Sequence, residues 1–285
     1  MQSLIFSAST NKGLHRDNNE DSFLSLPERG LWVVADGMGG HEAGEVASAI
    51  VRETLEQTDS ETRLAASLQR SHKAVVEAAN AGIGAKGMGS TVVALKSRHH
   101  DYQVAWVGDS RAYLWSQNDN GGQLEQLSTD HSYVQMLAAS GAIEASELEN
   151  HPDKNIITQC IGWQELDEVT VDTVEGVWQK NQWIVLCSDG LNDEVDDAEI
   201  ARLLNCAKKT KDAVELLINA ALENGGHDNI TIQVIESPLY KRRVSLKLTQ
   251  WIAKKIAYGG INTVFYSAVA IGLSLTAYWL LASDF

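Results

Sequence analysis

One segment holds both a buried strand and a candidate site: Leu31-Trp32-Val33-Val34-Ala35-Asp36-Gly37-Met38-Gly39-Gly40-His41. Five apolar residues in a row are typical of a strand that is buried on both faces, and this strand ends at a carboxylate, Asp36. The three glycines that follow allow the backbone to turn and to approach closely whatever the carboxylate binds. The segment therefore predicts a core strand that delivers one acidic side chain to a site.

The same pattern occurs twice more in the chain. An apolar run from Val104 ends in Gly108-Asp109, and another from Val185 ends in Asp189-Gly190. An Asp-Gly pair is also common in turns between strands, so a single instance has that simpler explanation. Three strand ends of this kind favour a shared acidic site.

Composition narrows the class of protein. The 285 residues are 44% hydrophobic and 21% charged, which is typical of a folded chain that can bury a full core. The net charge of −15 argues against a nucleic-acid partner, because phosphate backbones are bound by basic surfaces. The three cysteines lack Cys-x-x-Cys spacing and are expected to be packing thiols in a reducing compartment.

The charge is unevenly placed along the chain. Residues 237–285 carry six basic residues and one acidic residue, a net charge of +5, which leaves −20 for residues 1–236. An acidic body with a basic tail suggests two different roles. We predict a catalytic domain at 1–236, a basic juxtamembrane linker at 237–258 and a transmembrane helix at 259–282.

The segment 259–282 contains no charged residue and is long enough to cross a bilayer as a helix. Tyr258, Tyr278 and Trp279 lie near its ends, where interfacial aromatic residues are expected. A buried core helix is the alternative, but such a helix is rarely apolar on every side. The basic residues before the segment predict a single-pass protein whose domain lies in the cytoplasm.

Hydrophobic periodicity predicts helices at 42–57 and 61–80, and a second pair at 197–206 and 211–223. Short β-branched and aromatic runs between 90 and 127 predict an antiparallel meander. Strand groups that alternate with helix pairs favour an α+β domain with sheet in the middle and helices outside. Residues 130–162 are mixed and polar, and they are predicted to leave the core.

Acidic residues gather at the strand ends and glycine turns. Like charges in one place repel one another, and Mg²⁺ or Mn²⁺ relieves this because such ions take carboxylate and carbonyl oxygens. None of these positions offers the His and Cys ligands that zinc favours. Two ions that share a water lower its pKa and make hydroxide available. The acidic residues in question are Glu20, Asp21, Asp36, Asp109, Asp189, Asp193 and Asp228.

Two further features point to a phosphate substrate. Asp36 lies at a rigid strand end beside the Gly37 carbonyl, which suits a ligand that bridges two ions. Arg16 offers a planar fork of donors suited to a pair of phosphate oxygens. The residues therefore predict a two-metal phosphoester hydrolase.

Six segments, in order and at compatible spacings, resemble the motifs of the metal-dependent protein phosphatase family, type 2C, and its bacterial branch most closely. The resemblance covers residues 3–236. The segments are Arg16-x-x-Asn19-Glu20-Asp21, Asp36-Gly37-Met38-Gly39-Gly40, Gly89-Ser90-Thr91, Gly108-Asp109-Ser110-Arg111, Ser188-Asp189-Gly190-Leu191-x-Asp193 and Gly226-His227-Asp228-Asn229.

The resemblance implies a fold, an activity and a setting. The fold is a central antiparallel β-sandwich flanked by helix pairs, in four layers (α-β-β-α). The activity is hydrolysis of phosphoserine and phosphothreonine in proteins with Mn²⁺ or Mg²⁺. A Ser/Thr protein kinase of the same pathway is the implied partner, and with the predicted anchor the protein is expected at the inner (cytoplasmic) membrane.

The resemblance also implies a role for each acidic residue. Asp36 matches the ligand that bridges two ions, and Gly37 supplies its carbonyl oxygen. Asp189 and Asp228 match ligands of the first ion, and Glu20 and Asp21 serve the second, largely through water. Asp109 and Asp193, with Asp189, match a weaker third-metal site, and Arg16 matches the arginine that binds phosphate. Residues 130–162 match the variable flap beside the active site.

One departure concerns the proton donor. Met38 stands where animal members carry a histidine proposed as the general acid, and bacterial members often share this. His41 and a water on the third metal are the alternatives, whereas His131 and His227 are expected to be structural.

Two other function classes remain. A binding-only relative would need a broken acid set, and every expected acid is present. A phosphatase that acts on a small-molecule phosphate is the other alternative.

Overall fold

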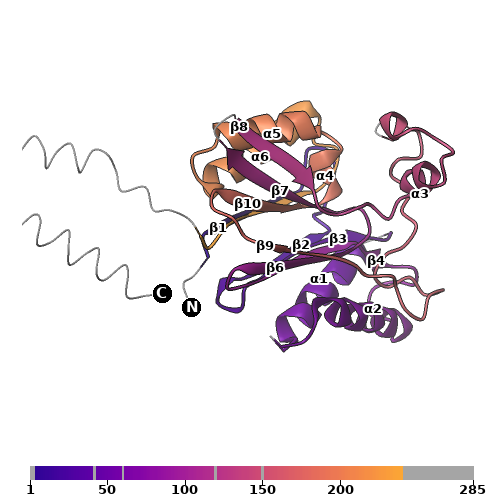
Figure 1. Ribbon diagram of the computed structural model, residues 1–285. Helices are drawn as coiled ribbons and strands as arrows, with labels where there is room; N and C mark the ends of the chain where they lie inside the picture. The colour runs from indigo at the N-terminus through magenta and orange to yellow at the C-terminus, as the bar shows by residue number, and fades with distance from the viewer. Residues whose placement is uncertain (1–3, 41–42, 60, 119–120, 149–150, 240–285) are drawn as a thin grey trace, which may run out of the picture. The chain divides into compact units, whose positions relative to one another are not determined.

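The computed structural model describes residues 4–40, 43–59, 61–118, 121–148 and 151–239, and these belong to one compact unit (Figure 1). Two antiparallel sheets lie in its middle. The first has the strand order β1 (Phe6–Asn11), β11 (Ile230–Glu236), β10 (Gln182–Cys187), β7 (Arg111–Asn118) and β8 (Gly121–Gln126). The second has the order β2 (Asp21–Leu26), β3 (Leu31–Met38), β5 (Val92–Arg98), β6 (Asp101–Val107) and β9 (Asp172–Val177), with the short β4 (Gly89–Ser90) paired to β3.

A pair of helices covers the outer face of each sheet (Figure 1). Helices α1 (Ala43–Gln57) and α2 (Leu64–Asn80) pack on the second sheet, and α5 (Asp197–Cys206) and α6 (Thr210–Asn224) pack on the first. The shorter elements are α3 (Tyr133–Ala139), α4 (Asp189–Asn192) and the 3-10 turns η1 (Pro27–Arg29) and η2 (Ala145–Glu147). The predicted α+β fold in four layers is confirmed in the part of the chain described.

Strand β3 shows why the layers form. Leu31, Val33 and Ala35 pack into the core cluster beneath α1 and α2. Trp32 and Val34 point the other way, into the cluster between the two sheets, and all five side chains are buried. Successive residues of a strand face opposite sides of a sheet, so a continuous apolar run is what a strand covered on both faces requires.

The predicted meander at 90–127 is wrong in one respect. Strands β5 and β6 pair within the second sheet, whereas β7 and β8 pair within the first. The chain crosses between sheets at Gly108-Asp109-Ser110, where Gly108 has φ +105°. Its missing side chain also allows close contact, because a Cβ there would lie 2.6 Å from that of Thr91. Propensity locates strands but does not say which sheet each one joins.

Strand β2 has no local apolar pattern at its start. The strand begins at Asp21 inside a run of charged residues, and it pairs with β3 along its whole length. The place of β2 in the sheet is therefore decided by its pairing with β3 rather than by the composition of the strand itself.

The excursion predicted at 130–162 is confirmed. The segment contains α3 and η2, and Figure 1 shows it extending beyond the ends of the sheets. Isolated bridges join Ser132 to Ile157 and Ser90 to Ile161, which closes the segment at its base. It therefore forms a flap.

No helix within the described ranges is long and apolar enough to cross a membrane. The predicted span at 259–282 and the predicted linker from residue 240 onward lie outside those ranges. The anchor stays a prediction.

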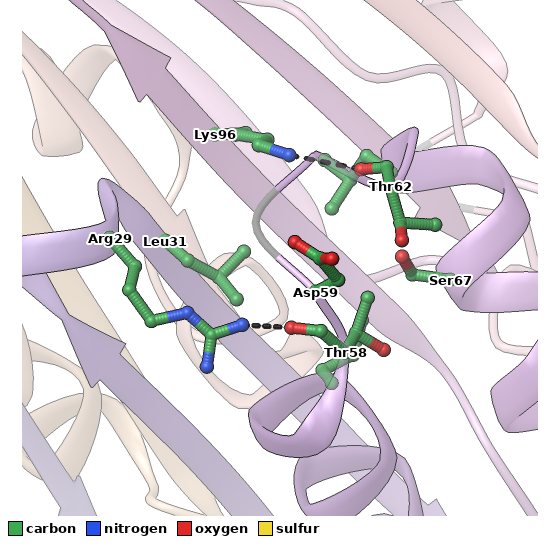
Figure 2. Close-up of a pocket in the computed structure, with 9 residues that line it drawn as sticks. Arg29, Leu31, Thr58, Asp59, Thr62, Ser67 and Lys96 are labelled. Atoms are coloured by element: carbon green, nitrogen blue, oxygen red, sulfur yellow. Dashed lines mark hydrogen bonds between the residues drawn. The ribbon is translucent and has the colours of Figure 1, made fainter.

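A small pocket of about 20 Å³ lies where the loop between α1 and α2 meets the second sheet (Figure 2). Lys96 Nζ donates to the carbonyl oxygen of Thr62 at 2.9 Å, and Arg29 donates to the carbonyl oxygens of Glu56 and Thr58. The pocket lies beside Leu31, at the end of β3 opposite to Asp36. These contacts fasten the helix pair to the sheet.

Candidate active site

The acidic site is built where four strands of the two sheets end. Asp21 and Asp36 are directly opposite each other on β2 and β3, so their side chains share one face of the second sheet. Asp189 follows β10 and Asp228 precedes β11, and these two strands are neighbours in the first sheet. The sandwich thus brings carboxylates from both sheets to one edge.

The carboxyl groups of Asp36, from the second sheet, and Asp189, from the first, are near enough to shift each other's pKa. Burial raises the pKa of Asp36 well above its ordinary value, and the charges of Asp21, Asp189 and Asp109 raise it further. Burial, with the charges of Asp109 and Asp228, likewise raises the pKa of Asp189. A divalent cation at this point relieves the same repulsion that otherwise favours protonation.

The neighbouring acids have raised pKa values for related reasons. Burial raises the pKa of Asp21 to about 6, although hydrogen bonds from Thr231 and Ser188 favour its ionised form. Burial and the charge of Asp130 raise the pKa of Asp109 to about 7. Such shifts gathered at one place are typical of a functional site.

Arg16 lies at the open side of this cluster. Its Nη2 donates to Asp228 Oδ2 at 2.6 Å, and its side chain is 53% exposed. Half-exposed and charged, the guanidinium can reach a ligand that enters from solvent.

The loop that carries Arg16 is held by Asn229, which is buried. The Asn229 amide donates to the carbonyl oxygens of Lys12 and Asn18 at 3.0 Å, and its Oδ1 accepts from the Glu20 backbone N–H at 2.7 Å. The polar segment between β1 and β2 is thereby fixed against the turn before β11.

Close backbone contacts explain two glycines at the site. A Cβ on Gly37 would lie 2.0 Å from the carbonyl oxygen of Gly44, and one on Gly44 would lie 2.4 Å from Glu20 Oε2. Glycine at both positions therefore allows three parts of the site to pack closely: the start of α1, the end of β3 and the Glu20 carboxylate.

Asp193 lies farther out and faces the flap. Its two oxygens accept from Lys154 Nζ at 3.1 Å and from Asn155 Nδ2 at 2.9 Å. Together with Asp109 and Asp189 it lines a pocket of about 390 Å³ beside the flap. The three acids of the predicted third site thus share one pocket, although Asp193 is engaged by flap residues.

The residues fit divalent cations by their donor chemistry. The Oδ1 atoms of Asp21 and Asp189 are buried without a hydrogen-bond partner, and leaving such a group unsatisfied costs about 1–3 kcal/mol or more. An ion or an ordered water is a usual explanation for such an atom. Every candidate donor is an oxygen, as Mg²⁺ and Mn²⁺ prefer.

The same acids also have protein partners. Asp228 pairs with Arg16, Asp193 pairs with Lys154, and Asp21 accepts the Ser188 hydroxyl. In this arrangement, no group of three or more His, Cys, Asp or Glu side chains among the described residues already stands where it could hold an ion.

Sequence reasoning missed a second charged pair at the base of the flap. Arg111 donates from Nε and Nη2 to both oxygens of Asp130, at 3.0 and 2.7 Å. Two hydrogen bonds lie next to this pair. The Gly108 backbone N–H donates to the ring Nδ1 of His131 at 3.1 Å, and the His131 backbone N–H donates to the Gly108 carbonyl oxygen at 2.9 Å. The flap is thus anchored to the turn that carries Asp109, and His131 has a structural role, as expected.

The other histidines bear on the proton donor. His227 Nδ1 lies 2.7 Å from Glu194 Oε1, and its ring stacks on that of His15 with centroids 4.8 Å apart. These contacts agree with the structural role expected of His227. His41 lies outside the described residues, so its proposed acid role stays a prediction.

Comparison with known proteins gives a consistent result. Residues 5–135 match the family model described as Protein phosphatase 2C. The serine/threonine phosphatase stp of Listeria innocua is 36% identical over 247 residues, which cover 82% of this chain and 96% of that protein.

Solved structures agree with the sequence comparison. The serine/threonine phosphatase PstP/Ppp of Mycobacterium tuberculosis is similar with a TM-score of 0.73 and 32% identity, over 82% of this chain and 98% of that one. The catalytic domain of the phosphatase PstP in complex with 2 manganese ions gives a TM-score of 0.69 and 32% identity, over 82% and 97%. The chain therefore belongs to the protein phosphatase 2C family and is a serine/threonine protein phosphatase of the bacterial type, a hydrolase.

Proposed function

We propose that the chain hydrolyses phosphoserine and phosphothreonine in proteins with two Mn²⁺ or Mg²⁺ ions held at the edge of the sandwich. The observation that carries this proposal is the pair of buried, unpartnered carboxylate oxygens, one on Asp21 and one on Asp189, brought together from opposite sheets. Members of this family use centres of two such ions, and a similar structure was solved with manganese.

In this proposal each acid has a distinct task. Asp36 would be held in common by the two ions, with the Gly37 carbonyl oxygen as a further ligand, and Asp189 and Asp228 would hold the first. Glu20 and Asp21 serve the second, and Asp109 and Asp193, with Asp189, form a weaker third site. When bound, the two ions lower the pKa of a shared water and so supply hydroxide near neutral pH.

The remaining chemistry belongs to the chain's own side chains. Arg16 binds two oxygens of the substrate phosphate and fixes its orientation, which its half-exposed position at the rim allows. In doing so it exchanges Asp228 for the phosphate as its partner. The flap and the adjoining 390 Å³ pocket border the path by which a phosphorylated protein segment reaches the acids.

Substrate class can be measured directly. In Mn²⁺, a phosphothreonine protein and a matched phosphothreonine peptide are expected to be hydrolysed with kcat/KM well above that of nucleotides or sugar phosphates. The readout is released inorganic phosphate at limiting substrate, with p-nitrophenyl phosphate as the reference. Faster turnover of a small-molecule phosphate than of every phosphoprotein would contradict the proposed substrate class and support the alternative.

We also propose that residues 259–282 anchor the protein in the cytoplasmic membrane, with the catalytic domain in the cytoplasm. Support comes from the uncharged apolar segment and the basic residues before it. The full chain is expected to sediment with membranes and to need detergent for release, whereas a chain ending at Ser237 is expected in the supernatant. A full chain that stays in the supernatant would refute the anchor.

A Ser/Thr kinase at the same membrane is the proposed partner, because hydrolysis of phosphoserine or phosphothreonine reverses kinase action. Phosphoproteomics of cells that carry the wild type or Asp36→Ala should show sites whose occupancy rises in the variant. Unchanged occupancy at every site would remove support for a kinase-opposing role.

A further inference from the structure

We propose that Ser188 is a positioning residue for Asp21: its hydroxyl holds one carboxylate oxygen so that the other faces the second divalent ion. This inference rests on the proposed two-ion function. The observation behind it is that Ser188, which directly follows β10, does not cap the helix that begins after it.

Ser188 occupies the N-cap position of α4, with extended backbone angles of φ −73° and ψ 168°. A serine at this position normally accepts a hydrogen bond from a backbone N–H in the first turn. The Ser188 side chain makes no such bond. Its hydroxyl instead donates to Asp21 Oδ2 at 2.8 Å, across the space between the two sheets.

The Ser188 hydroxyl is itself fixed by β11. The Thr231 N–H donates to Ser188 Oγ at 3.0 Å, and the Ser188 N–H donates to the Thr231 carbonyl oxygen at 3.0 Å. Since the hydroxyl has a single proton and Oγ already accepts from a backbone amide, the proton is left to point at the carboxylate. The Asn229 carbonyl oxygen is a more distant alternative acceptor at 3.4 Å.

The two oxygens of Asp21 therefore differ in their surroundings. Oδ2 accepts the Ser188 hydroxyl at 2.8 Å. Oδ1 is buried and has no partner. A carboxylate held by one oxygen, with the other left bare beside Glu20, is set to present that oxygen to a cation.

Two features place Ser188 between the acids of the two sheets. It is fully buried, and it directly precedes Asp189, which is proposed as a ligand of the first ion. One residue thus connects the acids of the first sheet with those of the second. Groups that orient metal ligands in this way typically affect ion affinity by about 10–100-fold.

The test is a calorimetric titration of the purified protein with MnCl₂ in the absence of substrate. Wild type is expected to bind two ions. Ser188→Ala is expected to keep one site near wild-type affinity and to lose about 10–100-fold at the other. Ser188→Cys fills the same space with a much weaker donor, so it should show the same loss even if the alanine variant folds poorly.

Ser97→Ala is the matched control. Ser97 is also buried, and its hydroxyl accepts from Trp178 Nε1 at 2.9 Å, a contact among residues that are not in the acid cluster. This variant should lose thermal stability and keep both Mn²⁺ affinities.

Two results would overturn the inference, and they are distinguishable. If Ser188→Ala and Ser188→Cys bind both ions as tightly as wild type while their Tm falls, Ser188 only ties the sheets together. If the wild type takes up no Mn²⁺, the proposed two-ion function fails and this inference fails with it.

Discussion

Asp36→Asn is expected to lower kcat toward a phosphothreonine protein about 1,000-fold or more. Asp36 is proposed to bridge both ions, and an amide offers neither the charge nor two equivalent oxygens. Losing several kcal/mol of metal-derived stabilisation corresponds to a rate loss of about that size. The measurement is initial-rate phosphate release across a range of Mn²⁺ concentrations.

The same variant should not be unstable in chelator. Asparagine has nearly the shape of aspartate and cannot ionise. It therefore avoids the cost of an ionised carboxylate at a position where burial and neighbouring acids raise the pKa of Asp36. We expect its Tm in chelator to equal or exceed that of wild type.

Asp101→Asn is the matched control for Asp36→Asn. Asp101 is an exposed strand residue at the start of β6, and the same change there should leave kcat within about twofold of wild type. An Asp36→Asn enzyme that retains wild-type kcat would refute the bridging role.

Removal of divalent ions is expected to have the other large effect. In excess chelator, phosphate release should fall by at least about 1,000-fold, because the proposed mechanism takes its hydroxide from water whose pKa the ions lower. Added Mn²⁺ or Mg²⁺ should restore it. The assay is a chelation and back-titration series at fixed pH.

Ion binding should also appear without substrate. A ligand at 100 times its Kd stabilises the folded state by about 2.7 kcal/mol, so Mn²⁺ should raise the Tm of wild type by several degrees. Asp36→Asn should show a smaller rise. Full activity in chelator would contradict the metal requirement, whereas a lost Mn²⁺ dependence of Tm alone would point to weak binding.

The sequence sufficed for those parts of the fold that depend on local pattern. The apolar run from Leu31 to Ala35 marked a strand buried on both faces, and the helix pairs followed from periodicity. The candidate ligands could be named because each acid lies at a strand end or a glycine turn. Local pattern also identified the flap at 130–162 as an excursion.

The remaining features depend on contacts between distant parts of the chain. Arg16 pairs with Asp228 across 212 residues, and Ser188 reaches Asp21 across 167. Neither contact has a local signature, because each exists only once the two sheets face each other. Likewise, the entry of β7 into the other sheet depends on the turn at Gly108 rather than on strand propensity.

The central claim is that acids from both sheets hold two divalent ions. Its most direct test is the number of Mn²⁺ ions bound per wild-type chain and per Asp36→Asn chain, measured by equilibrium dialysis with metal analysis. Wild type is expected to bind two or more ions, and Asp36→Asn at most one, at a Mn²⁺ concentration that saturates wild type. A wild-type chain that binds no Mn²⁺, or an Asp36→Asn chain that binds as many ions as wild type, would contradict it.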